Sequence, residues 1–150
     1  MTSKILVPID LADMQTADKV LQAAVEQASF SKARLVVMTV IPDILAGLDW
    51  RYAIRGETGG SEEFDMKAIV DQALKRLNQI VAEAVPKGMQ VETVARRGTI
   101  YEQVLDVAEK TDVDQIVMGA HRPGLSDFLL GPNTARIVRH AKCSVNVIRI

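Results

Sequence analysis

The sequence predicts an α/β fold with a doubly wound, mostly parallel sheet of five strands and four helices. Short apolar runs rich in β-branched residues alternate along the chain with longer segments whose apolar residues recur at helical spacing. This alternation is typical of a parallel sheet with helices on its faces. With 150 residues, 48% of them hydrophobic, the chain has the size of one domain burying about 68–70% of its unfolded surface. We therefore expect a single domain over residues 1–150.

The first half of the chain predicts a strand–helix–strand unit followed by a second helix. Lys4 to Pro8 and Ala33 to Ile41 are apolar runs of the kind found in buried parallel strands. Between them a helix is indicated by the spacing of Val20, Leu21, Ala24, Val25 and Ala28. The second helix is indicated by a longer apolar stripe, which we expect to face the core, at Met66, Ile69, Val70, Ala73, Leu74, Leu77, Ile80, Val81 and Ala84.

The second half of the chain predicts three more strands and two more helices. Gln90 to Arg96 alternates apolar and polar residues, as a less buried strand does. The helix that follows opens at Gly98-Thr99, and Thr99 with Glu102 has the spacing of a capping box. The remaining elements are a strand, a helix and a last strand, at Gln115 to Met118, about Pro132 to His140, and Ser144 to Ile150.

The segment that follows the fourth predicted strand suits a bound phosphate. The strand stops at Gly119, and a polar loop leads to Gly131-Pro132, where a helical pattern begins. A helix amino end has backbone N–H groups without intrahelical partners and carries partial positive charge. Since Gly131 has no Cβ, a phosphate oxygen can approach those groups closely. The alternative interpretation of Gly131 is a hinge between loop and helix.

The chain resembles the universal stress protein family over almost its whole length, and two segments carry the resemblance. They are Val7-Pro8-Ile9-Asp10 and the block from Gly119 to Ile150. The loop His121-Arg122-Pro123, continued by Leu129-Leu130-Gly131, is similar to that of a small single-domain bacterial subgroup. The resemblance implies a Rossmann-like nucleotide-binding fold with strand order 3-2-1-4-5, and a homodimer that binds ATP or AMP, with Mg²⁺ held through the phosphates.

The implied strand order brings Asp10 and Gly119 to one crevice, because ligands of such sheets bind where the strand order reverses. The Asp10 carboxylate can accept a hydrogen bond from an adenine amino group or a ribose hydroxyl; its alternative role is that of a turn or cap residue. The expected ligand-binding residues are Pro8, Ile9, Asp10, Val40, Met118, Gly119, His121, Arg122, Gly131, Pro132, Asn133 and Thr134. No catalytic residue and no protein metal ligand is expected.

The chain departs from the usual family pattern at the phosphate end. Pro132 stands where the family usually has Ser or Thr, and it has no N–H to donate. Asn133 and Thr134 are expected to substitute for that hydroxyl.

The second glycine of the usual pattern is replaced by Arg122, and the loop is one residue shorter. A guanidinium can form bidentate hydrogen bonds to phosphate, the alternative being a solvated loop arginine. Three roles stay open for His121: contact with a phosphate, packing of its ring on a ribose, or a plain surface position.

The last predicted strand has little chain after it to cover its edge. In the family this strand pairs antiparallel across a two-fold axis. The resemblance therefore implies a homodimer through Ser144 to Ile150, with Val145, Val147 and Ile148 as interface or core positions.

Charge and motifs exclude several other classes of function. The net charge is −1, from 18 basic and 19 acidic residues, which recommends neither nucleic acid nor an anionic membrane as partner. The chain has neither a G-x-x-x-x-G-K-[ST] segment nor a G-x-G-x-x-G segment after the first strand. Cys143 is the only cysteine, so no internal disulfide forms. The apolar run before Pro8 is only three residues long, too short for a signal peptide, and we expect a cytoplasmic protein.

These observations favour a nucleotide-dependent regulatory protein of the bacterial stress response. Pro42 to Gly60 is long for a connection, for which about 2–6 residues is usual, and is expected to fold over a ligand or pack on a regulatory partner protein. Two alternatives stay open: a weak ATP hydrolase using the same crevice, and a dimeric interaction module that binds no nucleotide.

Overall fold

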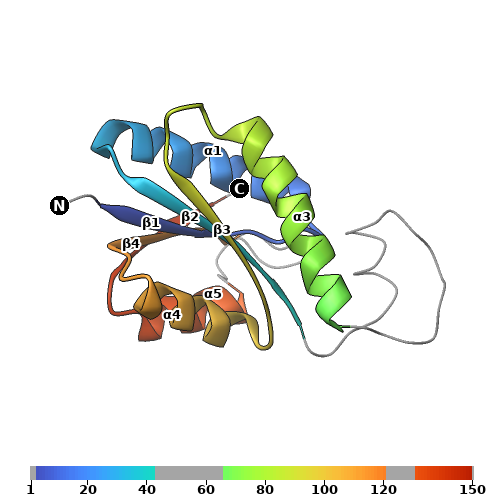
Figure 1. Cartoon of the computed structure of the whole chain (residues 1–150). Helices are drawn as coiled ribbons and strands as arrows, with labels where there is room; N and C mark the ends of the chain where they lie inside the picture. Colours follow the sequence, from blue (N-terminus) through green and yellow to red (C-terminus); the bar gives the residue numbers. More distant parts are fainter. Residues whose placement is uncertain (1–2, 43–65, 121–130, 150) are drawn as a thin grey trace.

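A computed structural model describes residues 3–42, 66–120 and 131–149 of the chain (Figure 1). The predicted alternation of strands and helices is confirmed over these residues. In chain order the elements are β1 (Lys4–Pro8), α1 (Met14–Ser31), β2 (Arg34–Ile41), α3 (Met66–Ala84), β3 (Val91–Arg97), α4 (Ile100–Lys110), β4 (Gln115–Gly119), α5 (Pro132–His140) and β5 (Ser144–Ile148).

The strands form one parallel sheet in the order β3-β2-β1-β4-β5, as expected. The central strand β1 aligns Leu6 with Val36 of β2 and with Ile116 of β4. Helices α1 and α3 cover one face of the sheet, and α4 and α5 cover the other (Figure 1). The fold is therefore a Rossmann-like α/β sandwich with its order reversal between β1 and β4.

The molecule has one hydrophobic core on each face of the sheet, and strand β2 contributes to both because its side chains alternate between the two faces. Leu35, Val37 and Ile41 pack with α1 and α3, whereas Val36 and Met38 pack with α4. Every residue of β2 after Arg34 is buried. A strand buried on both faces explains the near-continuous apolar run in this part of the sequence.

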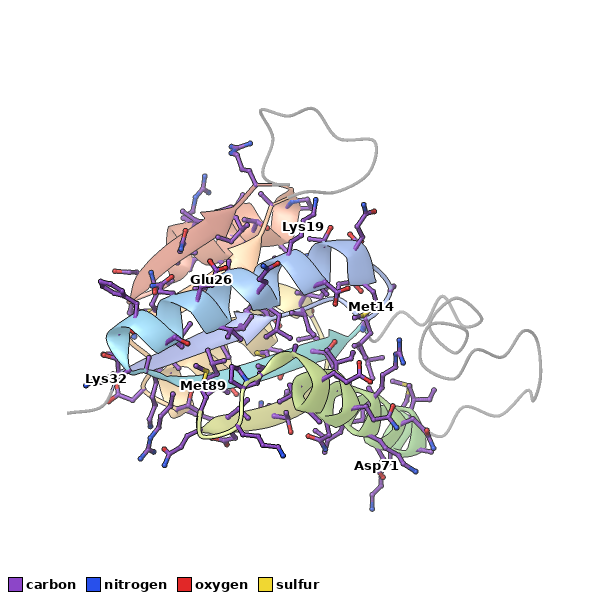
Figure 2. The ribbon with its side chains drawn as sticks, turned by 90° about the horizontal axis from the view of Figure 1, so that it is seen from above. Met14, Lys19, Glu26, Lys32, Asp71 and Met89 are labelled. Atoms are coloured by element: carbon purple, nitrogen blue, oxygen red, sulfur yellow. The ribbon has the colours of Figure 1, made fainter. Side chains whose placement is uncertain are left out.

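The core on the face that carries α1 and α3 is covered at its margins by half-buried side chains. Figure 2 looks down on this face, with Lys19 and Glu26 on the exposed side of α1. Met14 at the start of α1 and Met89 after α3 are half-buried and pack against the core beneath them. Among the described residues, no helix is long and apolar enough to cross a membrane.

The predicted capping box at the start of α4 is wrong. Thr99 is the N-cap residue, with φ −77° and ψ 127°, but its side chain makes no capping hydrogen bond. The N–H of Tyr101 donates instead to Oδ1 of Asn133 in α5, at 3.3 Å. A tertiary contact thus supplies an acceptor for one of the amides in the first turn of α4 that have no partner within the helix. At α1, by contrast, Asp13 is a local cap that accepts from the Thr16 N–H at 3.3 Å.

Some expectations concern residues outside the described parts of the chain. The expected ligand contacts of His121 and Arg122 lie outside the described residues, and so does the segment after Pro42 that is expected to fold over a ligand or pack on a partner. The last strand runs from Ser144 to Ile148 within the described residues, and the final residue of the predicted run, Ile150, lies outside them.

Candidate functional site

A cavity of about 470 Å³ lies at the carboxyl ends of β1 and β4, where the strand order reverses. The chain leaves β1 for α1 on one face of the sheet, and α5 lies on the other face. The divergence of these connections opens a crevice at this position in sheets of this class. Every expected ligand-binding residue in the described part of the chain lines it: Pro8, Ile9, Asp10, Val40, Met118, Gly119, Gly131, Pro132, Asn133 and Thr134.

Other residues that line the cavity were not anticipated. They come from the start of α1, from α4 and from the end of β4: Ala12, Asp13, Thr16, Ala17, Val20, Ile100, Val104 and Ala120. Asp13 had a usable signal, because an Asp before an apolar helical pattern is a common N-cap. The alanines and valines had none, since small apolar residues read as ordinary core until the fold shows which of them face a cavity.

The inner wall of the cavity is apolar. Val40 at the end of β2 and Met118 in β4 are 6% and 7% exposed, and both belong to the core beside α4. Ile9 is 7% exposed and belongs to the opposite core. Its N–H donates to the Met38 carbonyl at 2.8 Å, which holds the chain against β2 just past the end of β1. A flat, weakly polar group would be desolvated against this wall at little cost.

Asp10 makes a tight turn at the mouth of the cavity. Its Oδ1 accepts the Ala12 N–H at 2.9 Å, and its carbonyl accepts the Asp13 N–H at 3.0 Å. The turn role considered for this residue is therefore present, on an exposed carboxylate that also lines the cavity. The turn fixes the carboxyl group in place, which reduces the entropy lost when it binds a ligand.

Gly119 lets α1 approach the end of β4. A Cβ at this position would stand 2.9 Å from Cγ2 of Thr16 and 2.9 Å from Cγ2 of Val20. Real Cβ atoms are essentially never found so close to other atoms, so the side chains of Thr16 and Val20, or the helix that carries them, would have to shift. The neighbouring Ala120 N–H donates to the Ile148 carbonyl at 3.0 Å and ties this end of β4 to β5.

The start of α5 forms the opposite wall. Gly131 is its N-cap, with φ 87° and ψ 155°, a conformation essentially restricted to glycine. The first backbone hydrogen bond of the helix runs from Ala135 N–H to the Gly131 carbonyl at 3.0 Å. The amides of Asn133 and Thr134 precede that bond and have no partner within the helix. They can receive an anion at the positive end of the helix dipole.

The side chains at the start of α5 are tied into the fold. Thr134 is 7% exposed, and its hydroxyl donates to the Gly119 carbonyl at 3.2 Å. Asn133 accepts the Tyr101 N–H, and the guanidinium of Arg136 lies 4.8 Å from the centre of the Tyr101 ring. These contacts hold α5 against both β4 and α4, so the wall is built before any ligand arrives.

Asp106 and Cys143, whose pKa values are shifted, do not line the cavity. The Arg96 guanidinium, 2.9 Å from Asp106, lowers the pKa of that carboxyl, and Lys110 at 3.2 Å adds to the effect. Burial raises the pKa of the Cys143 thiol, with a smaller contribution from the charge of Asp114. Within the described residues, no group of three His, Cys, Asp or Glu is placed to hold a metal ion.

Comparison with known families and sequences gives a consistent result. The model of the universal stress protein family matches residues 1–149. Universal stress protein G of Escherichia coli O157:H7 is 26% identical over 149 residues, covering 99% of this chain and 100% of that protein. Universal stress protein YxiE of Bacillus subtilis strain 168 is 28% identical over 153 residues, with coverage of 99% and 100%.

Solved structures share the fold. Hypothetical protein MJ0577 aligns with a TM-score of 0.75 at 22% identity, covering 100% of this chain and 97% of that one. A universal stress protein in complex with cAMP gives 0.65 at 18% identity, with coverage of 99% and 97%. One from Archaeoglobus fulgidus in complex with dAMP gives 0.65 at 19% identity, with 97% of both chains covered. At these identities the likeness shows the fold.

Proposed function

Because the chain belongs to the universal stress protein family, we propose that it binds an adenine nucleotide in the cavity between β1 and β4. The nucleotide acts as a regulatory ligand of a cytoplasmic homodimer in the stress response. The observation that carries this proposal is that an apolar wall, a fixed carboxylate and the amino end of a helix all line one cavity. Its volume of about 470 Å³ lies within the usual range of about 300–1,000 Å³ for small-molecule sites.

The base packs against the apolar wall. Ile9, Val40 and Met118 offer a desolvated surface to the flat ring. The Asp10 carboxylate accepts a hydrogen bond from the amino group of adenine or from a ribose hydroxyl, and a guanine ring would present a carbonyl oxygen in place of that amino group. A carboxylate facing a carbonyl oxygen is unfavourable, so a contact of Asp10 with the base makes ATP preferred to GTP, whereas a contact with the ribose leaves the two equal.

The phosphates lie at the start of α5. The N–H groups of Asn133 and Thr134 and the helix dipole hold them. ATP with Mg²⁺ is the proposed physiological form, with the ion bound mainly through the phosphates, as is usual for this cation. Universal stress proteins solved in complex with cAMP and with dAMP support the choice of an adenine nucleotide as the ligand.

The proposed homodimer uses the edge strand β5. Among the described strands, β5 pairs only with β4, which leaves its other edge without a strand partner. Val145, Val147 and Ile148 are half-buried, and an added strand would bury them further. Antiparallel pairing of two β5 strands about a two-fold axis joins the sheets of the two protomers.

A second candidate is a dimeric interaction module without nucleotide. Two observations favour it: Pro132 removes a backbone donor at the first position of α5, and the Thr134 hydroxyl is already bonded to Gly119. Both reduce the number of donors available to phosphate compared with a helix that begins Gly-Ser or Gly-Thr.

The test begins with protein purified without added nucleotide. The protein is denatured, any released small molecule is identified by chromatography and mass, and thermal unfolding is measured with Mg-ATP, Mg-GTP and buffer. ATP at 100 times its Kd adds about 2.7 kcal/mol of stability. Analytical ultracentrifugation measures the oligomeric state in the same samples.

A pair of tryptophan variants controls for the position of the effect. Ala12 and Ala135 are both exposed, but only Ala12 lines the cavity. Ala12→Trp fills the cavity and abolishes the shift with Mg-ATP, whereas Ala135→Trp retains it. A dimer that carries no nucleotide and shows no shift with Mg-ATP would support the interaction module instead.

A further inference from the structure

Asn133 joins the amino ends of α4 and α5 at the wall of the cavity. Its Oδ1 accepts the N–H of Tyr101, the second residue of α4, at 3.3 Å. That amide lies in the first turn of α4 and has no acceptor within its own helix. The contact spans 32 positions of the sequence and replaces the cap that Thr99 does not provide.

This hydrogen bond determines which end of the carboxamide is available to a ligand. A backbone N–H can only donate, so the atom that faces it is the carboxamide oxygen and not the nitrogen. The remaining polar end of this side chain, which lines the cavity, is the Nδ2 group. This group has two N–H donors and cannot itself accept a hydrogen bond. Such a group binds acceptors, and the phosphate oxygens are the strongest acceptors of a nucleotide.

Neighbouring residues at the start of α5 lack such a donor. Pro132 has neither an N–H nor a polar side chain. Thr134 has one hydroxyl proton, and it is donated to the Gly119 carbonyl at 3.2 Å. Of the three consecutive residues at this helix start, Asn133 alone retains side-chain donors that internal hydrogen bonds do not use.

We propose that Asn133 is a specificity-determining residue whose Nδ2 donates to a phosphate oxygen and so selects nucleotides over nucleosides. The inference rests on the proposed function and concerns its phosphate end. Tyr101 positions the carboxamide, and Arg136, with its guanidinium 4.8 Å from the Tyr101 ring centre, holds the two helices together one turn further along. The side-chain amide takes the place of the donor that Pro132 removes.

Asn133→Asp separates this role from a purely structural one. An aspartate retains an oxygen that accepts the Tyr101 N–H, so the link between α4 and α5 is kept. It replaces both donors by an acceptor and adds a negative charge beside the phosphate. Asn78→Asp is the matched control, because Asn78 in α3 also accepts a hydrogen bond, from the Thr93 hydroxyl at 2.5 Å, and does not line the cavity.

The experiment measures AMP and adenosine binding by isothermal titration calorimetry for the wild type and the two aspartate variants, with thermal unfolding as a check on folding. The expected result is that Asn133→Asp weakens AMP binding about 10- to 100-fold and changes adenosine binding less than about twofold. Asn78→Asp leaves both affinities within about twofold of the wild type.

Other outcomes overturn the inference in recognisable ways. AMP binding by Asn133→Asp equal to that of the wild type would show that Nδ2 makes no phosphate contact, while the nucleotide site itself stands. Equal losses of AMP and adenosine would make Asn133 a structural link only. A wild-type protein that binds neither AMP, adenosine nor ATP would overturn the proposed function itself.

Discussion

Gly119 lies against Val20 so closely that a Cβ added to the glycine would stand 2.9 Å from the valine Cγ2. The same atom would stand 2.9 Å from Cγ2 of Thr16. The end of β4 therefore packs directly against the side chains of Thr16 and Val20 in the first half of α1, with no side chain of its own at Gly119. This close approach forms one side of the cavity, which Gly119, Thr16 and Val20 all line.

Gly119→Ala is expected to destabilise the protein by about 1–3 kcal/mol, because the added methyl group overlaps the side chains of Thr16 and Val20 and these must shift. Urea unfolding measures the change in free energy. The control is the double variant Gly119→Ala/Val20→Ala, in which the shorter side chain at position 20 removes one of the two close contacts of the methyl group. The loss of unfolding free energy in the double variant is expected to be less than the sum of the losses in the two single variants. Strict additivity would show that the two side chains do not collide.

Gly131→Ala is expected to destabilise the protein by about 1–3 kcal/mol even without a ligand, because φ is 87° there. Loss of nucleotide binding in this variant therefore requires a control for backbone strain. Gly88→Ala supplies it, since Gly88 has φ 94° with no atom within 4 Å of an added Cβ, and it does not line the cavity. Unfolding should show a similar loss of stability in both variants. Titration with ATP should show loss of binding only in Gly131→Ala.

Asp10→Asn and Asp10→Ala should differ in stability and agree in ligand binding. Asparagine retains an oxygen for the Ala12 N–H, whereas alanine removes the acceptor of a turn that precedes α1. We expect Asp10→Ala to be the less stable by about 0.5–1.5 kcal/mol. Both variants should bind ATP about tenfold more weakly, because both lose the carboxylate. Wild-type affinity in Asp10→Asn would mean that the carboxylate makes no contact with the nucleotide.

Asp106→Asn should remove part of the acid sensitivity of folding. The hydrogen bond from Arg96, with help from Lys110, lowers the pKa of the folded Asp106 carboxyl below its ordinary value of 3.8. A lowered pKa means that the unfolded state takes up its proton first as the pH falls. The stabilisation is therefore present above pH 3.8 and is lost below it, as the pH passes through the lower pKa of the folded protein.

Unfolding free energies of the wild type and Asp106→Asn, measured from pH 2 to pH 6, provide the comparison. The variant is expected to lose less stability in acid than the wild type. Arg96→Met should have a similar effect, because it removes the largest cause of the shift. Parallel curves for all three proteins would contradict the assigned role of Arg96.

The secondary structure was well predicted where apolar spacing and turn residues agree. The stripe from Met66 to Ala84 and the helix from Pro132 to His140 coincide with α3 and α5. In each case a local rule suffices, the 3.6-residue period in one and Pro at the first helical position in the other. The strand order followed from the family resemblance, because periodicity does not specify which strands are neighbours.

The capping box shows where local patterns fail. Thr99 and Glu102 have the right spacing, yet the Tyr101 N–H pairs with Asn133 from another helix. Similarly, the Thr134 hydroxyl, which is expected to substitute for the usual Ser or Thr hydroxyl at the phosphate, donates a hydrogen bond to the Gly119 carbonyl that no local pattern predicted. In both cases a polar group near a helix start finds an acceptor or donor that the packing of β4, α4 and α5 brings within reach.

The sequence by itself determined the order and type of the elements and the edge of the sheet at which Asp10 and Gly131 lie. Hydrophobic periodicity and turn chemistry act over a few residues, so they can be read along the chain. Only the tertiary structure decided that Gly119 contacts Val20, that Thr134 bonds to Gly119, and that Asn133 turns its donors away from Tyr101. These contacts join residues distant in sequence, and their geometry depends on how the helices pack against the sheet.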